Sequence, residues 1–206
     1  MLRPTRRDIG TLLAILLLVP GSPVRGSRQD STAHAETVLT PYADKDAYLI
    51  YAILLESSKS PSFVIQSETD SQSLATPKNV GIKGDRSFHR VWGTALKDFA
   101  SQYHNPRLLT RDIPIEGPYE LVSQRTLTSI FKSTGGWNTF YERYPSSGGV
   151  FSFSAVGFDA QRVRAIVQMN HNCGLLCGYG QPHFFEKKDG KWLEVSVKAS
   201  VTVWAS

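Results

Sequence analysis

The sequence has little cysteine and no apolar segment long enough to span a bilayer. Two Cys among 206 residues exclude a disulfide-dense scaffold. The apolar run at residues 12–19 has eight residues, whereas a transmembrane helix needs about 20. The sequence also lacks a Gly-x-Ser-x-Gly elbow, a His-Glu-x-x-His motif and a phosphate-binding loop. Its motifs therefore identify no familiar class of serine hydrolase, zinc protease or nucleotide-binding enzyme.

The composition is that of a folded chain with a modest positive charge. Hydrophobic residues make up 41% and aromatic residues 11%, which excludes a wholly disordered protein. The formal net charge is +5, but residues 1–26 contribute +3 from four Arg and one Asp, so +2 remains for the rest. The remaining basic residues form short pairs rather than a clustered stripe. We therefore expect no nucleic-acid partner.

The N-terminus is typical of an export signal. Arg3, Arg6 and Arg7 precede the short apolar run, and a Pro-Gly-Ser break follows it. We interpret residues 1–26 as a signal peptide. Cleavage after residue 35 is a second option, and a short membrane anchor or a buried helix is the alternative to cleavage. Residues 27–41 are predicted to be a disordered lead-in to a single domain at 42–206. The predicted location is secreted or periplasmic, with no stable membrane span after cleavage.

Hydrophobic periodicity predicts helices first and strands later in the chain. Apolar residues recur at helical spacing over 44–57, 87–103, 123–132 and 137–144. A short strand is expected at 63–69, and the period changes to two in predicted strands at 150–158, 162–170, 183–187 and 192–204. Four successive strands with short turns most simply form an antiparallel meander. We therefore predict an α+β fold, with N-terminal helices packed on a C-terminal antiparallel sheet of about four strands.

A glycine-rich loop that holds both cysteines is the strongest candidate for a special site. Cys173 and Cys177 are separated by three residues that include Gly174, so the loop can turn tightly. Because an exported chain meets an oxidising compartment, we predict a Cys173–Cys177 disulfide and no metal or cofactor. A redox pair is a second interpretation, although the usual catalytic spacing has two intervening residues. A zinc site of His171, Cys173, Cys177 and His183 is a third, although this spacing matches no familiar zinc finger.

Two further sets of residues could carry chemistry, and each has a structural explanation. Glu68 and Asp70 lie two apart after a predicted strand and could form a carboxylate pair, but solvated residues at a strand end are the simpler interpretation. The aromatic residues of 137–144 could form a stacking shelf for a sugar or a peptide. Aromatic residues at helical spacing are more often part of the core.

An ordered series of motifs runs through roughly residues 120–204. It consists of Trp137-x-x-Phe140-Tyr141-x-x-Tyr144-Pro145, Ser154-x-Val156-Gly157-Phe158, Cys173-Gly-x-x-Cys177-Gly178-x-Gly180 and Glu186-Lys187-x-x-Gly190-Lys191-Trp192. This series resembles that of a group of exported bacterial proteins of unknown function. The resemblance implies export and one α+β domain. It implies no assigned activity, so no catalytic residue can be carried over to this chain.

Taken together, these observations favour an exported, soluble domain that acts by binding a ligand, which the sequence does not identify. The first alternative is a cell-envelope hydrolase with an unrecognised active site. The second is a metal or redox protein centred on the Cys173/Cys177 loop. No residue pattern identifies the chain as an enzyme.

Overall fold

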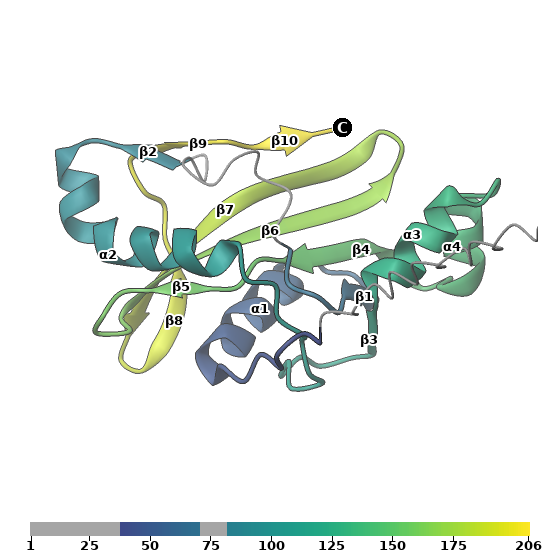
Figure 1. Cartoon of the computed structure of the whole chain (residues 1–206), viewed down its shortest axis with the longest axis horizontal. Helices are drawn as coiled ribbons and strands as arrows, with labels where there is room; N and C mark the ends of the chain where they lie inside the picture. The colour runs from purple at the N-terminus through teal and green to yellow at the C-terminus, as the bar shows by residue number, and fades with distance from the viewer. Residues whose placement is uncertain (1–37, 71–81) are drawn as a thin grey trace, which may run out of the picture. The chain divides into compact units, whose positions relative to one another are not determined.

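A mixed β-sheet with helices on both faces forms the centre of the structure (Figure 1). The computed structural model describes residues 38–70 and 82–206. The predicted signal peptide and residues 27–37 of the predicted lead-in lie outside the described residues. Side chains alternate between the two faces of a strand, so neighbouring residues of β1 (Ser62–Gln66) contact different helices. Phe63 and Ile65 pack with α1, whereas Val64 packs with α3 and α4.

Helices form where the apolar spacing predicts them, and three of them begin at a capping side chain. The helices are α1 (Lys45–Ser57), α2 (Arg86–Tyr103), α3 (Gln124–Lys132) and α4 (Trp137–Arg143). The side chains of Asp44, Asp85 and Ser123 accept hydrogen bonds from backbone N–H groups in the first turns of α1, α2 and α3. Such caps satisfy donors that have no partner inside the helix. The four predicted helices are therefore confirmed, with ends that differ by one residue.

The strands form one large sheet and a separate two-stranded sheet. The large sheet has the order β10-β7-β6-β4-β1-β3, with β5 paired to β6 and β8 paired to β7, and the small sheet pairs β2 with β9. The remaining strands are β2 (Ile82–Gly84), β3 (Tyr119–Val122), β4 (Ser147–Phe153), β5 (Gly157–Phe158), β6 (Arg164–Gly174), β7 (Cys177–Lys188), β8 (Lys191–Glu194), β9 (Ala199–Val201) and β10 (Trp204–Ala205).

The predicted fold class is wrong, because the sheet is mixed rather than an antiparallel meander. Strand β1 lies inside the large sheet and pairs in parallel with both β3 and β4. Helices α3 and α4 come between β3 and β4 in the chain, so the helices do not all precede the sheet. The predicted strand at 192–204 is divided among β8, β9 and β10. Alternation of apolar residues shows which side chains are buried, but it does not show which strands are neighbours.

The hydrophobic core consists of three clusters, one on one face of the sheet and two on the other. The cluster under α1 is the largest, and in it Tyr51 stacks on Phe153 with ring centroids 4.6 Å apart. Burial raises the pKa of Tyr51 well above its ordinary value, and its hydroxyl donates to Ser154 O at 2.8 Å. On the other face, α2 covers Ile166 and Phe184 in one cluster, and α3 and α4 form a second. The sheet face opposite α1 is therefore covered by α2 over one part and by α3 and α4 over another.

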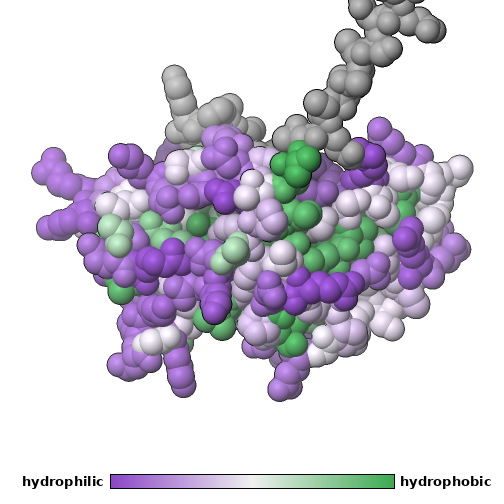
Figure 2. All heavy atoms as spheres, turned by 60° about the horizontal axis from the view of Figure 1, so that its bottom comes forward, coloured by the Kyte–Doolittle hydropathy of each residue, from purple (hydrophilic) through white to green (hydrophobic). Residues whose placement is uncertain are grey.

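Some hydrophobic side chains remain at the surface. Figure 2 shows one face of the molecule, on which they form green patches bordered by hydrophilic residues in purple. Scattered exposed apolar residues are normal for a folded chain. Two of the most exposed, Leu175 and Leu176, are adjacent and are 85% and 88% exposed. They lie between β6 and β7, at the tip of the longest hairpin.

Candidate functional site

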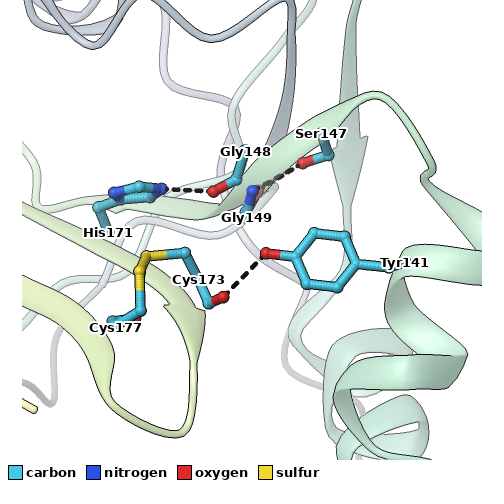
Figure 3. Close-up of a disulfide and its surroundings, with 7 residues drawn as sticks. All are labelled: Tyr141, Ser147, Gly148, Gly149, His171, Cys173 and Cys177. Carbon is cyan, nitrogen blue, oxygen red and sulfur yellow. Dashed lines mark hydrogen bonds between the residues drawn. A yellow bond between two sulfur atoms is a disulfide. The ribbon is translucent and has the colours of Figure 1, made fainter.

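The tip of the β6–β7 hairpin is closed by a disulfide. Cys173 and Cys177 are joined, with their Cα atoms 5.0 Å apart (Figure 3). Gly174 pairs with Cys177 across the hairpin and has φ 158. Glycine adopts this backbone conformation without the steric cost that a side chain would add. The predicted disulfide is therefore confirmed, and it closes a turn that exposes Leu175 and Leu176.

Two hydrogen bonds connect this tip to neighbouring elements. Tyr141 of α4 donates its hydroxyl to Cys173 O at 2.9 Å, and His171 Nε2 lies 2.9 Å from Gly148 O in β4 (Figure 3). A carbonyl oxygen can only accept, so Nε2 carries a hydrogen. Burial lowers the pKa of His171 and outweighs the opposite effect of its hydrogen bond to Gly148, which favours a neutral ring. The His171 ring also stacks on Phe151 at 4.2 Å.

Gly149 allows β4 to approach the hairpin closely. Its φ is 125, and a Cβ atom at this position would overlap Asn172 O in β6. The hydroxyl of Ser147 holds the same segment by donating to Gly149 O at 2.7 Å. The hairpin tip is thus fixed to β4 and α4 by backbone contacts as well as by side chains.

The alternative zinc set is not brought together. Cys173 and Cys177 are bonded to each other, and His183 pairs with Val167, four residue pairs farther from the tip than His171. At about 3.3 Å per residue, this separation is about 13 Å along the strand. His183 Nδ1 instead donates to Glu194 Oε1 at 2.6 Å, which lowers the pKa of that carboxyl. Within residues 38–70 and 82–206, no group of three or more His, Cys, Asp or Glu could hold a metal ion.

The two carboxylates at the end of β1 do not form a pair. Glu68 Oε2 accepts the backbone N–H of Gln124 at 2.8 Å, at the start of α3. Asp70 Oδ2 accepts from Asn170 Nδ2 at 2.7 Å, in a polar group over the middle of the sheet. Their partners belong to different elements, so each carboxylate has a structural role of its own.

A groove of about 910 Å³ lies beside the hairpin tip. Its floor is the sheet face opposite α1, with Gln66, Val150 and Asn172, and its walls are α3, the turn into α4, the start of α4 and the hairpin residues Gly174 and Leu175. We call it the helix–hairpin groove. A hollow of about 540 Å³ beside α1 is smaller. The helix–hairpin groove is the candidate site because aromatic and polar side chains converge on it from several elements.

The aromatic residues of α4 divide between the core and the groove. Phe140 and Tyr144 are buried, as the core interpretation expects. Trp137 lines the groove together with Phe131, with the two ring centroids 4.6 Å apart. Tyr141 stacks behind Trp137 at 5.8 Å and holds the hairpin. Half of the predicted stacking shelf therefore forms the core, and one of its rings borders a cavity.

Four carboxamide side chains line the groove, and sequence analysis missed all of them. They come from β1, α3, α4 and β6 and are Gln66, Gln124, Asn138 and Asn172. Among the described residues, only Gln66 of these four makes a side-chain hydrogen bond, from Nε2 to Glu68 O at 3.1 Å. No sequence signal could have identified the set, because its members are spread from residue 66 to residue 172 and belong to no motif.

Comparison with protein-family models, with curated proteins and with solved structures finds no significant match. In the part of the chain that the structure describes, no helix is both long and apolar enough to cross a membrane.

Removal of the disulfide is expected to lower stability only moderately. A double Cys173→Ser, Cys177→Ser variant should fold and lose about 2 kcal/mol, because the bond closes a short loop and restricts the unfolded chain little. Neither cysteine belongs to any of the three core clusters, and Tyr141 bonds the backbone oxygen of Cys173 rather than its sulfur. Denaturant melts of the variant and of the oxidised protein measure the difference. Intact mass with a thiol trap verifies the oxidised state, and failure of the variant to fold would contradict the expectation.

Proposed function

We propose that the chain is an exported binding module and that the helix–hairpin groove is its ligand site. The observation that carries the proposal is the convergence of two aromatic rings and four carboxamides on one cavity of about 910 Å³. Ligand sites typically combine apolar walls with a few polar groups that orient the ligand. Cavities of about 300–1,000 Å³ are usual for such sites.

The rigidity of the hairpin supports a binding role. Its tip is held by the Cys173–Cys177 bond, by the hydroxyl of Tyr141 from α4 and by the hydrogen bond of His171 to Gly148 in β4. Binding costs less free energy when the site does not have to be ordered first. The tip also holds Leu175 in an exposed position at the rim of the groove, where the side chain can cover a bound ligand.

The disulfide supports export. Cys173 and Cys177 lie at an exposed turn, where a thiol pair would be accessible to cellular reductants. Such bonds persist in oxidising compartments and are rare in reducing ones. Together with the positively charged start and short apolar run of residues 1–26, this favours a secreted or periplasmic location.

The proposal is tested by fragment binding to the oxidised protein. We expect a library of neutral organic fragments without saccharides to shift the backbone amide signals of Gly135, Gly136 and Gly174 in ¹H–¹⁵N spectra. Trp137→Ala should weaken the best fragment at least tenfold, because it removes the largest ring of the wall.

The matched control is Leu49→Ala. Leu49 is 45% exposed on α1, away from the groove, so its replacement should leave fragment affinity within twofold. Fragments that bind only elsewhere, or equal losses in both variants, would contradict the assignment of the groove as the ligand site.

A further inference from the structure

The polar groups of the helix–hairpin groove can both donate and accept hydrogen bonds. A carboxamide offers two N–H donors and an acceptor oxygen, and Gln124, Asn138 and Asn172 present this combination from three elements. Thr128 and Thr134 add hydroxyl groups with the same dual character. A ligand rich in hydroxyl groups, each of which also donates and accepts, is complementary to such a lining.

The lining carries little charge. Among the described residues that line the groove, Lys132 is the one ionised side chain, and it lies exposed in the last residue of α3. Recognition of a charged ligand normally places opposite charges or Arg clusters against it. Uncharged amides instead match a neutral ligand, because no buried charge has to be compensated.

The aromatic rings supply a flat apolar surface beside these amides. Trp137 and Phe131 are half-buried and line the wall, and Leu175 faces the cavity from the hairpin. A pyranose ring has an apolar face of C–H groups and a rim of hydroxyl groups. An aromatic ring next to several carboxamides can contact both at once.

The sheet beneath the groove does not suit an extended peptide. Peptides that bind to sheets add a strand to an open edge and use its free backbone groups. The floor residues Gln66, Val150 and Asn172 come from β1, β4 and β6, and each of these strands has neighbours on both sides. The floor therefore offers no free strand edge, and recognition depends on side chains.

From this geometry we infer that the helix–hairpin groove binds a neutral oligosaccharide, an inference that rests on the proposed function of the groove. The aromatic wall contacts the apolar faces of the sugar rings. The carboxamides of Gln124, Asn138 and Asn172 bind the hydroxyl groups.

The experiment is a titration of the oxidised, ¹⁵N-labelled protein with defined probes. The neutral probes are cellotetraose, maltotetraose and chitotetraose, the charged probe is tetragalacturonate, and the peptide probe is acetyl-Ser-Ala-Ser-Ala-amide. We expect at least one neutral tetrasaccharide to shift the signals of Gly135, Gly136 and Gly174. Tetragalacturonate and the peptide should bind at least tenfold more weakly.

Two substitutions separate hydrogen bonding from charge. Asn138→Leu keeps the approximate size of the side chain but removes its donors and its acceptor without adding a charge, so affinity for the neutral sugar should fall at least tenfold. Lys132→Gln removes the charge and should leave that affinity within twofold. Preferred binding of tetragalacturonate, or a tenfold loss in Lys132→Gln, would overturn the inference in favour of an anionic ligand.

The outcomes also separate this inference from the proposed function. If the peptide binds and the sugars do not, or if no probe binds while the saccharide-free fragments still do, the oligosaccharide inference fails and the binding function stands. If the fragments do not bind in the groove either, both fail.

Discussion

Trp92→Ala is expected to lower the free energy of unfolding by about 3–5 kcal/mol, the usual range for a large buried aromatic. Trp92 is 5% exposed on α2, and its ring meets Phe184 of β7 edge-on with centroids 5.3 Å apart. It also stacks on Phe88, one helical turn earlier, at 6.5 Å. The substitution therefore leaves a cavity between α2 and the sheet, in addition to the loss of buried apolar area.

The neighbouring residue provides the control. Val91, the preceding residue of α2, is also apolar but is 41% exposed, so Val91→Ala should cost less than about 1 kcal/mol. Denaturant melts of both variants measure the two losses of unfolding free energy. The comparison requires that this free energy depends equally steeply on denaturant concentration in both variants. If both variants lose a similarly small amount of unfolding free energy, α2 does not pack on the sheet through Trp92.

The second large effect is expected at Gly157, where β5 touches the backbone of α2. A Cβ atom at this position would overlap the backbone N and Cα atoms of Phe99. The contact is held by the N–H of Phe158, which donates to Asp98 Oδ2 at 2.8 Å. Gly157→Ala should therefore force α2 away from β5 and cost about 3 kcal/mol, because backbone atoms cannot rotate out of the way as a side chain can.

A Gly→Ala substitution within α2 should change the free energy of unfolding in the opposite direction. Gly93 lies inside the helix, and a Cβ atom there would meet no other atom within 4 Å. Gly93→Ala should raise the free energy of unfolding by about 1 kcal/mol, because alanine favours the helix over the unfolded chain. Thermal or denaturant melts of the two variants suffice, and destabilisation by both would contradict this explanation.

The helices show how much local pattern can predict. The apolar residues at helical spacing over 87–103 predict α2, and Phe88, Trp92, Phe99 and Tyr103 of this segment are buried in the structure. These features depend on residues within a few positions of each other, so the sequence contains the required information. Val91 is apolar and lies in the same segment, yet it is 41% exposed, so the spacing alone does not show which of these residues are buried.

The sheet shows where local pattern fails. The hydrophobic pattern predicts no strand between residues 103 and 123, yet β3 lies at Tyr119–Val122, directly after a segment with three prolines at 105–118. This strand pairs with β1, more than fifty residues earlier in the chain. Strand order is set by which edges meet during folding, and that information is not contained in the alternation of either strand.

By itself, the sequence determined the helices, the period-two segments and the closure of the Cys173–Cys177 turn, because each depends on residues close together in the chain. Only the tertiary structure decided that β1 lies between β3 and β4 and that α3 and α4 cover the face opposite α1. It also decided that Gln66, Gln124, Asn138 and Asn172 surround one groove. A groove of this kind forms where distant segments meet, and the contacts that bring them together arise from packing rather than from spacing along the chain.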